Sequence, residues 1–258
     1  MKILLFVLLI STLISSNTPE QTTTTATLTV AVAANVQFAM EELRREFKKE
    51  TGIDIKTVIS SSGKLTAQIQ NGAPFDVFLS ANIKYPETLY KGGYVTTKPK
   101  VYAYGSLVLW TLKDLDLSKG IDTLTDSKVQ KVAIANPKNA PYGIAAINTL
   151  NYYKIYKKVK RKLVYGESIS QTNLYVASET ADAGLTAKSV VLSPKMKGKG
   201  KWIEIDKSAY KPIAQGIVIT NHGGGNKDSA SQKFYNFLFS YKAKEILKKY
   251  GYIVEDKK

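Results

Sequence analysis

Two groups of small polar residues stand where predicted strands give way to predicted helices. Asn35 follows the apolar run LTVAVA at residues 28–33, and Ser61 and Ser62 follow the run IDIKTVIS at residues 53–60. The N–H groups in the first turn of a helix have no partner within the helix and carry the positive end of its dipole. Such a turn can bind an anion, although the same residues also serve as ordinary N-caps. Because both groups follow strands of a predicted parallel sheet, they indicate a ligand-binding edge.

The sequence contains no patterned catalytic centre. The single histidine, His222, is followed by three glycines, which indicates a surface turn rather than the base of a Ser-His-Asp triad. SSGKLT resembles the end of a phosphate-binding loop, but Val58 stands where that loop requires Gly, and Leu65 stands where it requires Ser or Thr. Acidic residues such as Asp76 and Asp114 have no patterned partner. We therefore expect a protein that is not an enzyme.

The composition excludes several further classes of protein. A chain of 258 residues with 44% hydrophobic residues can bury a substantial core. The absence of cysteine and the single histidine exclude disulfides, thiolate metal sites and multi-histidine centres, so we expect no resident cofactor or metal. The net charge of +16 suits an anionic partner. The basic clusters at residues 157–162 and 195–201 have no interleaved aromatic residues, which favours solvated surface and no nucleic-acid binding.

The first residues predict export. A basic start at Met1-Lys2 and an apolar run at residues 3–14 are typical of a secretory signal peptide, here over residues 1–16. The alternative is an N-terminal membrane anchor, but the run is short for a bilayer span. Residues 17–26, NTPEQTTTTA, predict a flexible leader. Because no cysteine is available to carry a lipid, we expect the protein to be periplasmic, held inside an outer membrane.

From residue 27 onward, short β-branched runs alternate with amphipathic segments. Strands are predicted at residues 28–33, 53–60, 75–81, 106–111, 131–136, 162–166, 183–187, 201–205 and 212–220. Near the C-terminus, Ser229 and Gln232 form a capping-box pair at the start of a long helix that Ser240 breaks in two. The alternation predicts an α/β fold with mostly parallel sheets covered by helices on both faces.

Four segments resemble the periplasmic molybdate-binding proteins of ABC importers. They are AANVQFAM, SSSGKLTAQIQNGAPFDVFLSA, NPKNAPYGIAAINTL and ILKKYGY, and the resemblance extends from about residue 27 to the C-terminus. It implies a two-lobed type II periplasmic-binding-protein fold, in which each lobe is a mostly parallel sheet flanked by helices. It also implies that a tetrahedral oxyanion, molybdate or the similarly sized tungstate, binds in the cleft between the lobes.

The resemblance further implies four ligand-binding residues. Asn35 lies where the family has Ser, Thr or Asn before its first helix, and Ser62 matches the ligand-binding Ser of the family. Tyr142 occupies a position whose backbone N–H donates to the ligand, and Ile169 aligns with another backbone donor. Some members add a Tyr hydroxyl after the strand that matches GLTA, where this chain has Ala187.

These observations predict a monomeric solute-binding protein that delivers its oxyanion to the membrane permease of an ABC importer. We expect one lobe to comprise residues 27–103 and 217–258, and the second lobe to be the insert at residues 104–216. The two crossings, near residues 102–105 and 211–216, would form the hinge.

Two other functions stay open at this point. A ferric-ion-binding protein of the same architecture would need several Tyr ligands, and Tyr152 and Tyr153 form an adjacent pair in a chain with 16 Tyr. We expect these two side chains to belong instead to the core-facing side of a helix. The second alternative is a secreted hydrolase that uses an acid or serine without a recognisable pattern.

Overall fold

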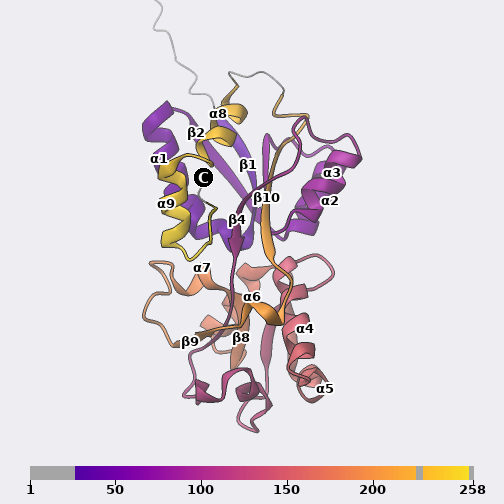
Figure 1. Ribbon diagram of the computed structural model, residues 1–258, viewed down its shortest axis with the longest axis vertical. Coiled ribbons are helices and arrows are strands. Elements are labelled where there is room, and N and C mark those ends of the chain that lie inside the picture. Colours follow the sequence, from indigo (N-terminus) through magenta and orange to yellow (C-terminus); the bar gives the residue numbers. More distant parts are fainter. Residues whose placement is uncertain (1–26, 225–228, 256–258) are drawn as a thin grey trace, which may run out of the picture.

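Two five-stranded sheets, one above the other in Figure 1, form the framework of the protein in a computed structural model. The structure describes residues 27–224 and 229–255. The predicted signal peptide and leader lie outside the described residues. Within the described part of the chain, the helices are too short or too polar to cross a bilayer.

The first sheet takes strands from both ends of the described chain. Its strands, in spatial order, are β2 (Asp54–Ser60), β1 (Thr27–Ala33), β3 (Val77–Ser80), β10 (Ile213–Ile219) and β4 (Lys100–Gly105). β1 pairs in parallel with β2 and β3, and β10 pairs antiparallel with β3 and β4. β10 is thus the one reversed strand, because it enters this sheet from the other lobe.

The second sheet repeats this arrangement. Its strands, in spatial order, are β7 (Leu163–Gly166), β6 (Val132–Ala135), β8 (Ala183–Ala187), β5 (Leu107–Thr111) and β9 (Lys201–Glu204). β6 pairs in parallel with β7 and β8, while β5 pairs antiparallel with β8 and β9. Here β5, which arrives from the first lobe, is the reversed strand. The predicted fold of two mostly parallel, helix-flanked sheets is confirmed.

Helices cover both faces of the first sheet (Figure 1). They are α1 (Gln37–Thr51), α2 (Ser62–Gln70), α3 (Lys84–Lys91), α8 (Ala230–Phe237) and α9 (Tyr241–Lys249), with the short 3-10 turn η1 (Ala34–Val36) before α1. On the side of α1, α8 and α9, the Phe47 ring lies 5.3 and 5.4 Å from the Phe234 and Phe237 rings. On the side of α2 and α3, Leu65 and Ile69 pack under the sheet.

The second sheet is also covered on both faces. Its helices are α4 (Pro141–Tyr152), α5 (Tyr156–Val159), α6 (Ile169–Ala177) and α7 (Lys188–Val191), with 3-10 turns η2 (Leu117–Thr125), η3 (Lys160–Lys162) and η4 (Lys207–Ala209). Trp110 is fully buried with Val176 of α6, and its ring N–H donates to the Lys199 carbonyl over 2.9 Å.

The C-terminal helix is divided at Ser240, as predicted. The Ser240 hydroxyl accepts the Ala243 N–H over 3.2 Å and so starts α9. The Ser229 hydroxyl likewise accepts the Gln232 N–H at the start of α8. The Gln232 side chain bonds Asn236 instead of returning to Ser229, so only half of the predicted capping box forms.

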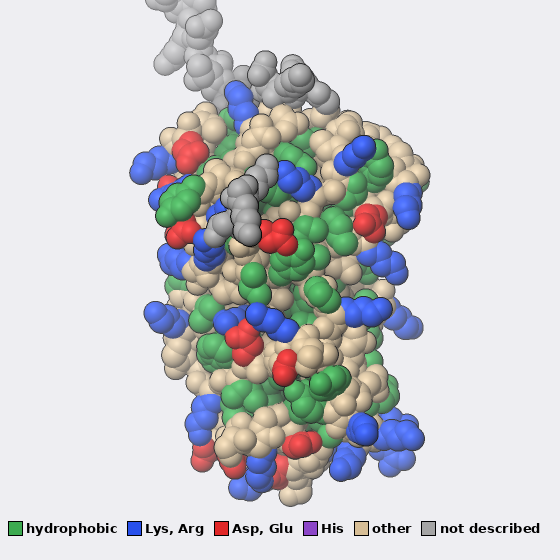
Figure 2. All heavy atoms as spheres, viewed as in Figure 1, with side chains coloured by type: hydrophobic (Ala, Val, Ile, Leu, Met, Phe, Trp, Pro, Cys, Tyr) green, Lys and Arg blue, Asp and Glu red, His purple; other side chains and the backbone are tan. Residues whose placement is uncertain are grey.

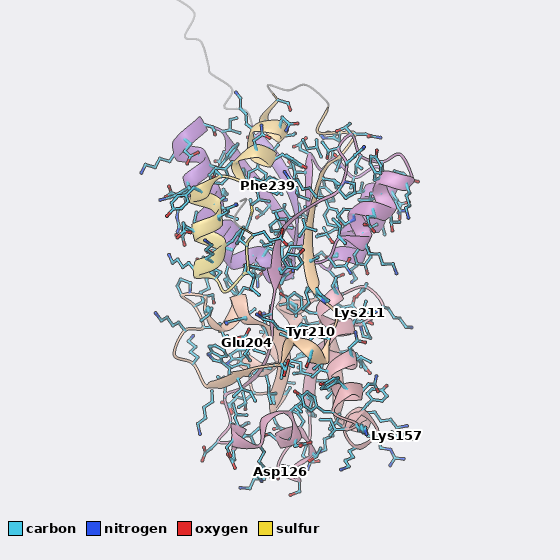
Figure 3. All side chains as sticks on the ribbon, in the orientation of Figure 1. Asp126, Lys157, Glu204, Tyr210, Lys211 and Phe239 are labelled. Carbon is cyan, nitrogen blue, oxygen red and sulfur yellow. The ribbon has the colours of Figure 1, made fainter. Side chains whose placement is uncertain are left out.

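The two segments that join the lobes pair with each other. Ile213 lies opposite Gly105, and Gln215 lies opposite Ala103, so the predicted hinge crossings are neighbouring antiparallel strands. Tyr210 and Lys211 lie at this waist, where the chain returns toward the first sheet (Figure 3). The division of the chain into an autonomous insert and a surrounding lobe stays a prediction.

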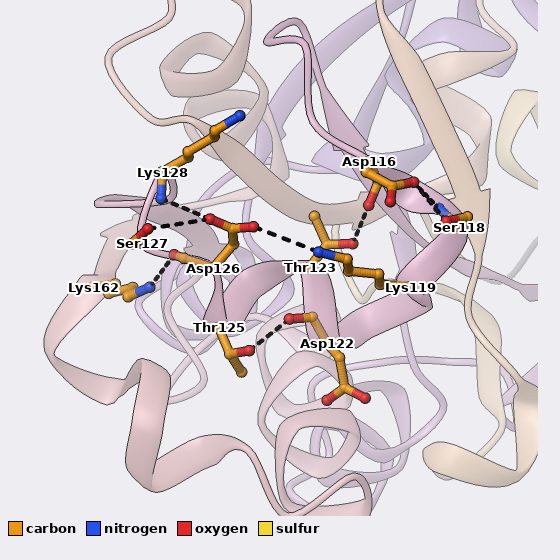
Figure 4. A network of polar contacts seen from close by, with 10 residues as sticks. All are labelled: Asp116, Ser118, Lys119, Asp122, Thr123, Thr125, Asp126, Ser127, Lys128 and Lys162. Atoms are coloured by element: carbon orange, nitrogen blue, oxygen red, sulfur yellow. Dashed lines mark hydrogen bonds and ion pairs between the residues drawn. The ribbon is translucent and has the colours of Figure 1, made fainter.

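Positive charge lies on the outside of both lobes (Figure 2). The predicted basic cluster at residues 157–162 forms α5 and η3, and its lysines are mostly exposed. Lys162 has a structural role, because its ammonium donates to the Leu124 carbonyl over 3.1 Å and to the Asp126 carbonyl over 2.8 Å. Figure 4 shows the second of these bonds. These bonds fix the turn that follows η2.

The aromatic contact between α1 and α8 predicts a large stability effect at Phe47. Replacing Phe47, which is 0% exposed, by Ala should lower the free energy of unfolding by about 3–5 kcal/mol, since it leaves a cavity between two rings. Tyr241→Ala is the matched control, because Tyr241 is 79% exposed and should change stability by no more than about 0.5 kcal/mol. Urea unfolding followed by circular dichroism measures both. Equal effects in the two variants would contradict this packing.

Candidate functional site

One small pocket lies between the two sheets, at the waist of the molecule. It is lined by Ala33, Ala34, Asn35, Ser61, Ser62, Ala81, Ala140, Pro141, Tyr142 and Ile169. The four site residues predicted from the sequence, Asn35, Ser62, Tyr142 and Ile169, are all among them. The structure therefore brings together residues from both lobes that are far apart along the chain. Within the described part of the chain, the residues that line this pocket include no charged side chain.

Three helices begin at the pocket without a side-chain cap. The N-cap residues of α2, α4 and α6 are Ser61, Ala140 and Ser168, and none of these side chains accepts a hydrogen bond from its helix. Ser229 and Ser240, by contrast, do cap α8 and α9. Uncapped first-turn N–H groups and the positive ends of three helix dipoles therefore point toward one place. This arrangement is suited to binding an anion.

The two serines at the start of α2 are held differently. The Ser62 hydroxyl accepts the Ala81 N–H over 2.9 Å, so its own proton remains free to donate. The Ser61 side chain is 3% exposed, and its hydroxyl has no hydrogen-bond partner. A buried polar group without a partner costs about 1–3 kcal/mol, which makes Ser61 a candidate ligand residue. From the sequence, Ser61 is expected only at a helix start, where an N-cap serine ordinarily bonds its own helix.

Asn35 is not an N-cap, contrary to the sequence-based expectation. The chain continues from β1 into η1, so α1 begins after Val36 and Asn35 lies inside the 3-10 turn. The Asn35 Nδ2 group donates to Gln215 Oε1 over 2.8 Å and to the Tyr252 hydroxyl over 2.9 Å. Both of its hydrogens are used, so the donor that Asn35 can offer to the pocket is its first-turn backbone N–H.

Tyr142 offers its backbone to the pocket, whereas its side chain is buried toward the crossing strands. Pro141 has no N–H, so Tyr142 supplies the first available donor of α4. The Tyr142 hydroxyl lies against Gly105 of β4, where an added Cβ would overlap it. Burial raises the pKa of this hydroxyl well above its usual range, so it stays protonated.

Ile169 is the first residue of α6 and is 3% exposed. Because its side chain is apolar, the polar group that Ile169 offers to the pocket is its backbone N–H. Ala187, where some members of the family have a tyrosine, ends β8 and is not among the lining residues. Two residues further on, the Ser189 hydroxyl donates to the Asn35 carbonyl over 2.7 Å and so reaches the pocket wall from the second lobe.

Direct contacts between the lobes close the pocket. The Gly63 N–H donates to the Asn139 carbonyl over 2.9 Å, and Ser170 donates to Gln37 over 3.0 Å. Lys64 and Glu167 form an ion pair across the same boundary. A Cβ on Gly63 would lie 2.8 Å from the Asn139 Cβ, so only glycine allows this close approach.

The other candidate centres do not gather into a site. His222 Nδ1 lies 2.9 Å from an Asp76 carboxylate oxygen on the surface, away from the pocket. In residues 27–224 and 229–255, no three His, Cys, Asp or Glu side chains are grouped so that they could hold a metal. Tyr152 and Tyr153 lie at the end of α4 and are 55% and 37% exposed. The expectation that they belong to the core is wrong, because at the C-terminal end of α4 their side chains are exposed to solvent.

The two-lobed fold and the pocket between the lobes are those of a solute-binding protein. Comparison with known proteins gives the same class. Residues 28–253 match the family of bacterial extracellular solute-binding proteins, and the chain belongs to that family.

Within the family, the most informative relatives are molybdate-binding proteins. The chain is 39% identical to the molybdate-binding protein ModA of Azotobacter vinelandii over 88% of this chain and 90% of the relative. It is 38% identical to ModA of Rhodobacter capsulatus over 87% of each. The solved periplasmic molybdate-binding protein of A. vinelandii superposes with a TM-score of 0.82 at 32% identity, covering 89% of this chain and 100% of that structure. The resemblance drawn from the sequence is therefore confirmed.

The close approach at Gly63 predicts that a side chain there will hold the lobes apart. Gly63→Ala should widen the distance distribution measured by small-angle X-ray scattering, because the new Cβ would meet Asn139. Ala67→Ser, at an exposed position of the same helix, is the control and should scatter like the native protein. Scattering curves that superpose for all three proteins would contradict the proposed role of Gly63.

Proposed function

We propose that this protein is an exported, periplasmic solute-binding protein that captures molybdate, or tungstate, and delivers it to the permease of an ABC importer. The observation that carries the proposal is the convergence of three uncapped helix N-termini on a pocket lined by neutral groups. The names of the relatives above support an oxyanion as the ligand. The activity is binding and release by a monomer, which needs neither a cofactor nor catalysis.

The neutral donors of the pocket are sufficient to bind a dianion. The hydroxyls of Ser61 and Ser62 and the first-turn N–H groups of Asn35, Tyr142 and Ile169 provide five donors. A hydrogen bond to a charged group contributes about 1.5–3 kcal/mol, so five contribute roughly 7–15 kcal/mol before the costs of binding. Micromolar affinity requires about 8 kcal/mol. Donors without formal charge also leave no uncompensated ion in the empty protein.

The hydrogen-bond donors of the pocket also affect which oxyanions bind. Backbone N–H groups can only donate, so they favour a fully deprotonated oxyanion over protonated phosphate, whose own proton needs an acceptor. Sulfate is likewise fully deprotonated but smaller, so the size of the closed pocket must separate it from molybdate. Molybdate and tungstate have nearly equal radii, and we propose that the protein binds both.

The two other functions are not favoured by the site. A ferric-ion site would need tyrosine hydroxyls, but the Tyr142 hydroxyl lies against Gly105 and the Tyr152–Tyr153 pair lies on the surface. A hydrolase would need an acid or base beside the ligand, and the described residues place no charged side chain on the pocket wall.

The two serines should respond differently to truncation. Ser62→Ala should raise the molybdate Kd about ten- to a hundredfold and also lower stability, because it leaves the buried Ala81 N–H unpaired. Ser61→Ala should raise Kd without lowering the stability of the ligand-free protein, since its hydroxyl has no partner there. Calorimetry and thermal unfolding measure the two quantities, with the exposed Ser178→Ala as control. A native Kd in both pocket variants would refute the assignment of the pocket.

The net charge of +16 predicts electrostatic steering of the anion. The association rate for molybdate should fall steeply with added salt, while the dissociation rate stays nearly constant, because salt screens long-range attraction but not a closed pocket. Stopped-flow measurements up to about 0.5 M salt, where the Debye length is about 4 Å, test this. A flat association rate would end the steering hypothesis and leave the pocket assignment intact.

A further inference from the structure

Gln215 is a buried polar residue at the crossing between the lobes. Its side chain is 0% exposed and lies on β10, where the chain re-enters the first sheet. The pairing with β4 is irregular at this point, because Gln215 lies opposite Ala103 and Gly216 lies opposite Val101. The unpaired residue between them is Tyr102. Bulges of this kind redirect side chains next to functional sites.

The orientation of the Gln215 carboxamide is determined by its partners. Its Nε2 group donates to the carbonyls of Ala81 and Ile213 over 3.2 and 3.1 Å. The reversed orientation would place its oxygen against two carbonyls, so Oε1 must face Asn35. The Asn35 Nδ2 group donates to that oxygen over 2.8 Å, which in turn fixes the orientation of Asn35.

A second residue holds Asn35 from the C-terminal segment. The Tyr252 hydroxyl, on a side chain 4% exposed, accepts from Asn35 Nδ2 and donates to the Asn35 carbonyl, both over 2.9 Å. Burial raises the pKa of Tyr252, so the hydroxyl keeps the proton that it donates. Asn35 is thus held on its side chain and its main chain at once.

The same glutamine reaches the other side of the pocket through Ala81. The Ala81 carbonyl accepts from Gln215, and the Ala81 N–H donates to the Ser62 hydroxyl over 2.9 Å. One side chain on the crossing strand therefore contacts both pocket-lining segments that follow β1 and β3.

We propose that Gln215 is a positioning residue for the ligand site. It is not among the residues that line the pocket, but it holds Asn35 directly, and Ser62 through Ala81, in the geometry of the closed pocket. Gln215 lies on β10, the strand that joins the lobes. Movement of β10 is therefore transmitted to the Asn35 N–H and to the Ser62 hydroxyl. This inference rests on the proposed function for its effect on binding, but not for its effect on the ligand-free protein.

Gln215→Leu removes all three hydrogen bonds while keeping a buried side chain, and Gln215→Glu keeps an acceptor for Asn35 but places an oxygen against two carbonyls. Both variants should raise the molybdate Kd roughly tenfold, through faster dissociation. Asn173→Leu is the control: Asn173 is also a buried carboxamide, 5% exposed, and it bonds Thr186 in the second lobe. It should lower the melting temperature but change Kd less than twofold.

Hydrogen exchange of the ligand-free proteins provides a readout that is independent of molybdate. In both Gln215 variants, amides near Asn35 and Ala81 should exchange faster than in the native protein, while those of β6 should not. If the native protein fails to bind molybdate, the proposed ligand is wrong, and the exchange pattern alone decides the positioning role. The proposal for Gln215 would be overturned if the amides near Asn35 and Ala81 exchanged at the native rate in the Gln215 variants. It would also be overturned if a folded Gln215→Leu variant bound molybdate with the native Kd.

Discussion

A dianion buried beside neutral groups needs hydrogen-bond donors around it, and no single helix can supply them. The first turn of each helix has only a few free N–H groups, which point along its axis. In this protein, α2 from one lobe and α4 and α6 from the other begin at the same pocket without a side-chain cap. The donor set is therefore complete only while the lobes are in contact. The hydrogen bond between the Gly63 N–H and the Asn139 carbonyl, and the close approach that glycine allows there, hold the lobes in this contact.

The topology explains how the two lobes share one site. Each sheet contains one reversed strand, β10 in the first and β5 in the second, because the chain enters each sheet from the other lobe. β4 and β10 consequently run side by side at the waist. Gly105 on β4 lies against the Tyr142 hydroxyl, and Gln215 on β10 bonds Asn35. The connections between the lobes are thus packed directly behind the pocket.

The charged side chains that the structure describes lie outside the pocket between the lobes. Lys and Arg side chains are spread over the outer surface of both lobes (Figure 2). The described residues that line the pocket include no charged side chain. In the proposed function, long-range attraction and short-range recognition are therefore carried by different groups. Surface charge acts through solvent over about one Debye length, while the pocket N–H groups act only on contact. Lys162 shows that a basic residue can also be structural, since it bonds two carbonyls at the turn after η2.

Local pattern in the sequence was enough to predict every described strand except β4, which was expected only as a hinge crossing, and also the break at Ser240. The resemblance to molybdate-binding proteins supplied the pocket positions of Asn35, Ser62, Tyr142 and Ile169. These features depend on the periodicity of apolar residues and on short motifs. The tertiary structure alone decided that Asn35 uses its carboxamide on Gln215 and Tyr252, and that the Ser61 hydroxyl has no partner. It also decided that Tyr152 and Tyr153 lie on the surface. Hydrogen-bond partners more than a hundred residues apart are set by how sheets and lobes pack, which no local spacing specifies.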